Sequence, residues 1–236
     1  MTNTSKGGGG RFAAVRVRGG KARKASSRQW LERQFNDPYV HEAKRRGLRS
    51  RAAFKLIEID DKAKLLRPGL RVVDLGAAPG GWTQVAVERV RAGRPGGGVV
   101  VAIDKEAMDP IPGAVVIQAD MTDPASDAAI LAALGGPADL VLSDMSPATV
   151  GHAQTDHLRI VALVEAAAEF ALRHLARGGA FVAKVFEGGT EQALLARLKQ
   201  SFAGIRHVKP PASRKESAEI YLVATGFRGA AEARAR

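Results

Sequence analysis

A lysine stands in the middle of an apolar run of the chain. Lys184 lies in AFVAKVF, which has the composition of a buried strand. A buried ammonium group is unfavourable unless it is paired with an acid or gives up its proton, and a neutral amine can take a proton from a substrate. Glu219 is a second charge that leads into an apolar strand, AEIYLVATG. The alternative is that Lys184 lies on an edge strand and extends its ammonium group into water.

A glycine-rich turn, GAAPGGWT at residues 76–83, follows the apolar run RVVDL. It lacks the Gly-Lys-Ser/Thr of a P-loop and does not match G-x-G-x-x-G. Asp104 and Asp120 end the next two apolar runs, where an acid can bind ribose hydroxyls or an adenine amino group. Asp74 and Asp144, which also lie at strand ends, would repel a pyrophosphate. The pattern favours a nucleoside with a neutral or cationic tail, such as S-adenosylmethionine, and a tight structural turn is the alternative.

Asp144 ends the apolar run ADLVLSD and precedes Met145-Ser146-Pro147. Enzymes that methylate base nitrogens place an aromatic residue shortly after this acid to stack a flipped base, and none is present here. Methylation of C5 in cytosine needs a cysteine nucleophile, and the chain contains no cysteine. Both chemistries are disfavoured, whereas methylation of an oxygen is compatible with these residues.

Alternating strands and helices must position these side chains. The composition predicts strands at 70–76, 97–104, 114–120, 138–144, 180–186, 205–210 and 218–227. Helical spacing or capping residues predict helices at 28–35, 39–46, 51–66, 82–92, 127–134, 155–179 and 191–202, with Ser27, Asp37, Ser50 and Thr190 as caps. Continuous apolar strands separated by helices predict an α/β fold with a mostly parallel sheet covered on both faces.

The net charge of +12 is concentrated at one end of the chain. Residues 1–55 contain 15 lysines and arginines against three acids, whereas residues 56–236 contain equal numbers of each sign. A basic flank on a neutral domain indicates a polyanionic partner bound through its phosphates. A solubilising tail is the alternative, and the glycine runs near the N-terminus disfavour a transit peptide.

The domain organisation follows from the same composition. We expect a basic, glycine-rich and disordered extension at 1–26, one domain at 27–228 and a short tail at 229–236. The chain has no run of about eighteen apolar residues and no secretory signal, so we expect no membrane span. The absence of cysteine is compatible with the cytoplasm, and we expect a monomer.

Five segments, in this order, resemble the FtsJ/RrmJ family of ribose 2′-O-methyltransferases. They are GLRSRAAFKLIEID, VVDLGAAPGGWTQ, LVLSDMSP, FVAKVF and AEIYLVATG, and the similarity covers roughly residues 27–227. The resemblance implies a Rossmann-like methyltransferase sheet of seven strands with the last one antiparallel, and S-adenosylmethionine as cofactor without a metal. It also implies a uridine ribose in the A-loop of 23S ribosomal RNA as acceptor, on an assembled or late-assembling 50S subunit.

The resemblance also assigns roles to particular residues. The family's catalytic set falls on Lys55, Asp144, Lys184 and Glu219, and its cofactor contacts fall on Gly80, Trp82, Asp104, Asp120 and Asp144. Without this resemblance, the local sequence around Lys55 would predict an ordinary solvated lysine on a helix. Family members usually carry Ala-Pro-Asn after the SDM run, whereas this chain has Ser146-Pro147-Ala148. A role for an Asn side chain there therefore does not carry over.

A ribose hydroxyl ionises far above neutral pH, so a base must take its proton as it attacks a methyl group. We expect Lys184 to be this base, with Lys55 orienting the alkoxide and Glu219 steering a lysine. Burial and the charge of Lys55 favour the neutral amine of Lys184, whereas Asp144 and Glu219 favour the charged form. The sequence leaves open which lysine is neutral before turnover.

A basic rim is expected around this site for binding RNA phosphates. Its members are Lys44, Arg45, Arg46, Arg49, Arg51, Arg214 and Lys215.

His152 and His157 have no metal-ligand spacing, and we expect them to be structural or solvated. Two other functions stay open: methylation of a tRNA ribose, and a non-catalytic role in ribosome assembly. The sequence does not identify the target nucleotide, because RNA shape often selects it.

Overall fold

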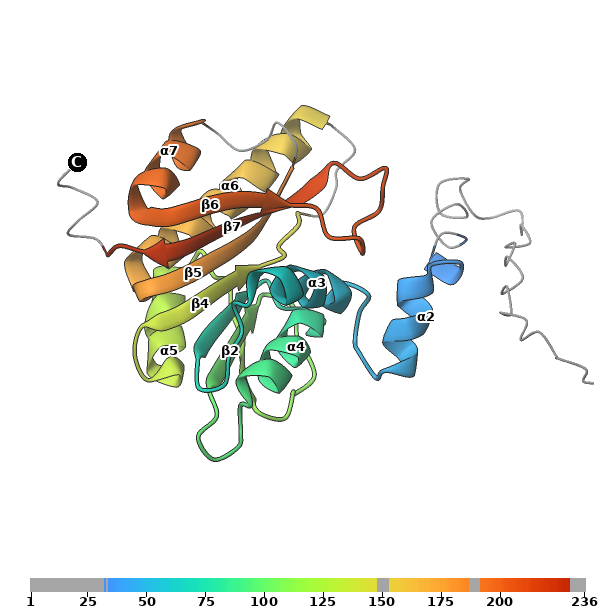
Figure 1. The fold of residues 1–236 in the computed structure, drawn as a ribbon, viewed down its shortest axis with the longest axis horizontal. Helices are drawn as coiled ribbons and strands as arrows, with labels where there is room; N and C mark the ends of the chain where they lie inside the picture. Colours follow the sequence, from blue (N-terminus) through green and yellow to red (C-terminus); the bar gives the residue numbers. More distant parts are fainter. Residues whose placement is uncertain (1–31, 33, 148–152, 187–191, 230–236) are drawn as a thin grey trace, which may run out of the picture.

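The computed structural model describes residues 32, 34–147, 153–186 and 192–229. Within these residues, seven strands form one sheet (Figure 1), and the strands are β1 (Arg71–Leu75), β2 (Val99–Asp104), β3 (Ala114–Gln118), β4 (Ala138–Ser143), β5 (Leu175–Phe186), β6 (Phe202–Val208) and β7 (Glu219–Phe227). The helices are α2 (Pro38–Arg45), α3 (Ala53–Ala63), α4 (Gly81–Val90), α5 (Pro124–Leu134), α6 (Ala153–His174) and α7 (Gln192–Ser201).

The strands lie in the order β3-β2-β1-β4-β5-β7-β6. The pairs from β3 to β5 are parallel, and β7 is antiparallel to both β5 and β6. The expected mostly parallel sheet with an antiparallel last strand is therefore confirmed. The chain runs outward from β1 to β3 and then returns to β4 on the other side of β1. Ligands of such sheets bind beyond the carboxyl ends of the strands at this reversal point.

Two apolar cores lie on the two faces of the sheet. Val73 and Leu75 of β1 belong to one core, which also contains Phe170 of α6. Val72 of β1 belongs to the other, which contains Leu56 of α3 and residues of α4. Successive strand side chains point to opposite faces, so a continuous apolar strand fills both cores. Helices α3 and α4 thus cover one face, and α5, α6 and α7 cover the other (Figure 1).

Several element boundaries differ from those expected. The helix predicted at 155–179 ends at His174, and β5 begins at Leu175 rather than at residue 180. Leu175 pairs with Ala138 of β4 across a shift in register, and Gly178 adopts a positive φ of 80°. Strand pairing, which local periodicity does not report, therefore ends the helix early. Strand β6 similarly begins at Phe202 instead of residue 205.

The predicted caps have different outcomes. Asp37 caps α2 by accepting from the backbone N–H of Tyr39 at 3.0 Å, as expected. Ser50 does not cap the next helix, because α3 begins at Ala53 without a side-chain cap. That helix also ends at Ala63, where the carboxylate of Asp60 accepts from the next two free N–H groups, those of Leu65 and Leu66. The expectations for Ser27, Thr190, Ala148, His152, the 1–26 extension and the 230–236 end lie outside the described residues, as does the side chain of His157.

Candidate active site

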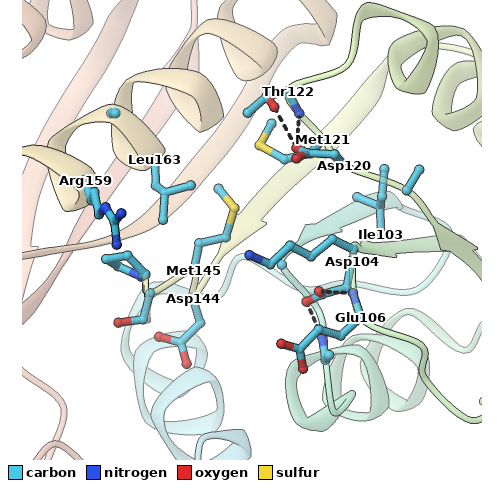
Figure 2. Close-up of a pocket in the computed structure, with 17 residues that line it drawn as sticks. Ile103, Asp104, Glu106, Asp120, Met121, Thr122, Asp144, Met145, Arg159 and Leu163 are labelled. Carbon is cyan, nitrogen blue, oxygen red and sulfur yellow. Dashed lines mark hydrogen bonds between the residues drawn. The ribbon is translucent and has the colours of Figure 1, made fainter. Parts of the chain in front are cut away.

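A cavity of about 730 Å³ opens beyond the carboxyl ends of β1, β2 and β4, at the reversal point of the sheet (Figure 2). Asp104, Asp120 and Asp144, three of the predicted cofactor contacts, all line it. Helix α6 contributes Arg159 and Leu163 from the other side. The volume lies within the range of small-molecule sites, which extends from about 300 to 1,000 Å³.

The glycine-rich turn forms part of the cavity wall. Gly76 lines the cavity and has a φ of 72°, and a Cβ on it would overlap Cγ of Met145. A larger residue would therefore push Met145, itself a lining residue, out of place. The absence of a side chain at Gly76 keeps the backbone accessible to a ligand, which is the close approach that such a turn permits.

Two carboxylates of the wall are held by the backbone. Asp104 accepts from the N–H of Ala78 through Oδ2 and from the N–H of Glu106 through Oδ1, both at 2.9 Å. Asp120 accepts from the hydroxyl and the N–H of Thr122 at 2.6 and 2.9 Å, and the hydroxyl bond is the main reason that the pKa of Asp120 is lowered. Fixed carboxylates accept hydrogen bonds from hydroxyl and amino groups and repel phosphate.

Trp82 and Gly80, the other predicted cofactor contacts, are not among the cavity-lining residues. The indole of Trp82 is buried, donates from Nε1 to the carbonyl of Ala52 at 2.8 Å, and lies 5.6 Å from the ring of Tyr221. Gly80 adopts a φ of 105° immediately before α4. Both residues support the turn and the helix that follows it, and their contact with a cofactor stays a prediction.

The four residues predicted as catalytic come together from α3, β5, β7 and the position directly after β4. Nζ of Lys55 (α3) lies 2.8 Å from Oε1 of Glu219 (β7) and 3.9 Å from Oδ1 of Asp144. Nζ of Lys184 (β5) donates to the backbone carbonyl of Asp144 at 2.7 Å and lies 3.3 Å from its Oδ1. Both lysines are only 7% exposed. The two alternatives, a solvated Lys55 and an edge-strand Lys184, are therefore wrong.

Glu219 and Lys55 form a buried ion pair. Burial raises the pKa of Glu219, but the Lys55 ammonium group, together with a hydrogen bond from Ser213, outweighs it and holds this pKa below its usual value. The Ser213 hydroxyl donates to Oε1 of Glu219 at 2.8 Å from the loop between β6 and β7. Glu219 is therefore ionised at neutral pH and presents a negative charge to Nζ of Lys55.

Tyr221 is a member of this cluster that the sequence reasoning missed. Its side chain is fully buried, its hydroxyl donates to Oδ1 of Asp144 at 2.7 Å, and Nζ of Lys55 lies 5.6 Å from its ring centre. The sequence could have predicted it, because Tyr221 follows Glu219 by two residues, and side chains two residues apart in a strand lie on the same face. Burial, followed by the charges of Asp144 and Glu219, raises the pKa of Tyr221 well above its usual value.

Asp74 is the second-last residue of β1 and is almost fully buried. Burial, opposed by a hydrogen bond from Thr83 and reinforced by the charges of Asp144 and Asp104, raises the pKa of Asp74 to about 7. The Thr83 hydroxyl donates to Oδ2 of Asp74 at 2.6 Å. Asp74 is therefore partly protonated at neutral pH.

The residues predicted for the basic rim fall into two groups. Lys44, Arg45, Arg46 and Lys215 are exposed, although Arg45 and Arg46 both contact Glu42, at 2.5 and 2.8 Å. The other three bind parts of their own chain. Arg51 contacts Asp37 at 2.8 Å and the carbonyl of Ala212 at 2.6 Å, and Arg214 lies 3.5 Å from Asp37. Arg49 donates to three backbone carbonyls.

A seven-stranded sheet with this strand order, a nucleoside-sized cleft at its reversal point and a Lys-Asp-Lys-Glu cluster beside the cleft define a methyltransferase. The model of the FtsJ-like methyltransferase family matches residues 48–227, and the chain belongs to this family. Among the described residues, no helix has the length and apolar character needed to cross a membrane.

Curated relatives extend the similarity to almost the whole chain. The chain is 61% identical over 233 residues to the ribosomal RNA large subunit methyltransferase E of Paramagnetospirillum magneticum, covering 98% of this chain and 95% of the relative. It is 60% identical to the protein of the same name from Rhodospirillum rubrum, covering 94% and 84%. A crystal structure of a ribosomal RNA methyltransferase from Plasmodium falciparum matches with a TM-score of 0.65 at 31% identity, covering 77% of this chain and 99% of that one.

Proposed function

We propose that the protein transfers a methyl group from S-adenosylmethionine to a ribose 2′-hydroxyl of large-subunit ribosomal RNA. One observation carries the proposal: Asp144 lines the cavity and also contacts both buried lysines. Asp144 would therefore lie between a methyl donor bound in the cavity and a lysine that acts as the base. Relatives named for large-subunit ribosomal RNA, at 60–61% identity, support the acceptor.

The residues of the cavity fit S-adenosylmethionine. Gly76 presents bare backbone, and Asp104 and Asp120 present carboxylates for ribose hydroxyls and an adenine amino group. Asp144 adds a negative charge on the side of the lysines, which suits a cationic ligand. When bound, S-adenosylmethionine supplies an electrophilic methyl group on a positively charged sulfur.

Lys184 is the base in this proposal. As a neutral amine, its Nζ would take the proton of the 2′-hydroxyl while the ribose oxygen bonds to the methyl carbon and the bond from that carbon to the donor sulfur breaks. Lys55 remains charged, because the ionised Glu219 lies 2.8 Å from it, and it stabilises the negative charge that develops on the oxygen. Asp144 holds Nζ of both lysines on the side of the cavity.

The acceptor that fits this family is a uridine ribose in the A-loop of 23S ribosomal RNA, on the assembled or late-assembling 50S subunit. The exposed cations of the basic rim, Lys44 and Lys215 among them, bind its phosphates. The protein acts as a monomer in the cytoplasm. Methylation of a tRNA ribose, or a non-catalytic role in assembly, are the competing outcomes that the experiments below separate.

Lys184→Ala tests the assignment of the base. We expect its kcat to fall by roughly 10²- to 10⁴-fold, which is the usual contribution of a general base. S-adenosylmethionine affinity, measured by calorimetry, should change little, because Lys184 is not among the cavity-lining residues. Lys62→Ala, an exposed lysine of α3, is the matched control. A variant that binds the cofactor and keeps the wild-type kcat would show that Lys184 is not the base.

The acceptor is tested by incubating the protein and labelled S-adenosylmethionine with 50S subunits, naked 23S RNA and tRNA. We expect methyl transfer to the ribosomal substrates, with the site mapped to one ribose by mass spectrometry. Transfer to tRNA alone contradicts the proposed acceptor. Binding of RNA without transfer to any of the three supports the non-catalytic role instead.

A further inference from the structure

Arg49 joins two loops that lie far apart in the sequence. Its Nη1 donates to the carbonyl oxygens of Pro79 at 3.2 Å and Asp109 at 2.7 Å. Its Nη2 donates to the carbonyl oxygen of Pro110 at 2.8 Å. Hydrogen bonds to a charged donor are stronger than neutral ones, so three of them form a substantial link between these two stretches of backbone.

The two loops are neighbouring parts of the cofactor cleft, since they follow the paired strands β1 and β2. Pro79 belongs to the glycine-rich turn, whose Gly76 and Ala78 line the cavity. Asp109 and Pro110 belong to the loop that follows β2, whose Lys105 and Glu106 also line it. Arg49 is not itself a lining residue. It therefore links the two loops without being part of the cavity lining.

The backbone around Arg49 is anchored as well. Its own N–H donates to Oε1 of Gln84 in α4 at 2.8 Å, and Nε2 of Gln84 donates back to the carbonyl of Gly47 at 3.1 Å. A Cβ on Gly80 would lie 2.6 Å from Ile111 and 3.1 Å from Nη1 of Arg49. The guanidinium group is thus packed closely against the turn, and its orientation is determined.

We propose that Arg49 is a positioning residue of the cofactor cleft, and that it sets the spacing between the glycine-rich turn and the loop after β2. The proposal rests on the proposed use of S-adenosylmethionine. It replaces the sequence-based expectation of a phosphate contact at this position, because three of the five N–H donors of Arg49 already bind carbonyls. A planar guanidinium can satisfy three separated acceptors at fixed angles, whereas a lysine ammonium cannot reproduce this geometry.

Arg49→Lys separates the two roles, because it keeps the charge and loses the three-carbonyl geometry. We expect S-adenosylmethionine affinity, measured by calorimetry, to weaken by about tenfold or more, the effect of losing roughly one charged hydrogen bond. Affinity for an A-loop RNA hairpin and its salt dependence should stay at the wild-type values. Arg67→Lys, at an exposed arginine outside the cavity lining and the basic rim, is the matched control and should leave both affinities unchanged.

A purely structural role is distinguished by kinetics. We expect Arg49→Lys and Arg49→Gln to raise the KM for S-adenosylmethionine with little change in kcat, at a temperature well below their Tm. A lower Tm with unchanged KM and cofactor affinity would overturn the proposal. A weaker salt dependence of RNA binding with unchanged cofactor affinity would overturn it in favour of a phosphate contact. If the wild-type protein itself fails to bind S-adenosylmethionine, the proposed function is wrong, and this outcome is visible before any variant is compared.

Discussion

The hydroxyl group of Tyr221 donates to Oδ1 of Asp144 at 2.7 Å, and the same oxygen lies 3.3 Å from Nζ of Lys184. Tyr221 in β7 pairs directly with Lys184 in β5, so strand register brings both side chains to Asp144. Because the pKa of Tyr221 is raised well above its usual value, the hydroxyl keeps its proton at neutral pH. Tyr221 therefore offsets part of the negative charge that the lysines face.

Tyr221→Phe should lower kcat by roughly 10- to 100-fold, the effect of one hydrogen bond to a charged group. Without this bond Asp144 attracts protons more strongly and favours the ammonium form of its lysine partners. The acid limb of the kcat profile should therefore move to higher pH, and cofactor affinity should change little. Tyr39→Phe is the matched control, since Tyr39 donates at 3.0 Å to a carboxylate outside the cluster, that of Glu58. A lower Tm together with an unchanged pH dependence of kcat would show that Tyr221 has only a structural role.

The sequence predicted the sheet well, because each apolar run is a local feature. It could not separate a buried Lys184 from one on an edge strand, since burial depends on which strands flank β5. Strand β7 pairs with β5 and places β6 at the edge, and no local pattern reports this order. The resemblance to a known family, rather than composition, singled out Lys55. Periodicity likewise could not place the end of α6, which pairing between Leu175 and Ala138 determines.

The partners of a single side chain, such as Arg49, could not be predicted from the sequence either. Its neighbours in the sequence are basic, so its charge suggested a phosphate contact, whereas its partners are carbonyls of two distant loops. A backbone carbonyl has no sequence signature, and long-range contacts to it follow from the fold alone. The acids at the strand ends were easier to place, because parallel strands bring their carboxyl ends to one edge.

The raised pKa of Asp74 predicts a pH dependence of stability. Its pKa is about 7 in the folded protein and 3.8 in the unfolded reference, so between these values the folded state binds the additional proton. The contribution of Asp74 to stability is therefore complete below about pH 4 and is lost as the pH rises to about 7, by an amount on the order of 4 kcal/mol.

Asp74→Asn removes this titration. The free energy of unfolding of the variant minus that of the wild type should increase steadily between about pH 4 and pH 7 and level off above it. Chemical denaturation across this range measures the difference. Asp109→Asn, an exposed carboxylate, gives the baseline series. A difference that is constant with pH would show that the pKa of Asp74 is not raised.

Gly76→Ala tests the close approach at the cofactor turn. Gly76 and Gly135 have nearly the same positive φ, 72° and 69°, so an added Cβ strains both backbones by about 1 kcal/mol. Only the Cβ at Gly76 overlaps Met145, which lines the cavity, whereas the Cβ at Gly135 meets nothing within 4 Å. Both variants should lose stability through backbone strain, Gly76→Ala the more because of its overlap with Met145, and only Gly76→Ala should lose cofactor affinity in calorimetry. Equal cofactor affinities for the two variants would contradict this description of the turn.

The exposed cations should contribute unequally to RNA binding. Lys44 has no carboxylate partner among the described residues, whereas Arg45 and Arg46 share Glu42, and their hydrogen bonds lower the pKa of Glu42 to about 2. An RNA phosphate must compete with Glu42 for both arginines. Lys44→Gln should therefore reduce the log–log salt slope of binding by about 0.7, and Arg45→Gln should reduce it by less.

Glu42→Gln provides the converse test, because it releases both arginines and should steepen the salt slope by up to about 1.4. Fluorescence anisotropy of an A-loop hairpin, titrated between about 50 and 200 mM salt, measures these slopes. Lys62→Gln, on the exposed side of α3, controls for the loss of one charge at another position. Equal slopes for the Lys44, Arg45 and Lys62 variants would mean that α2 does not contact the RNA, and that the phosphates are bound elsewhere on the protein.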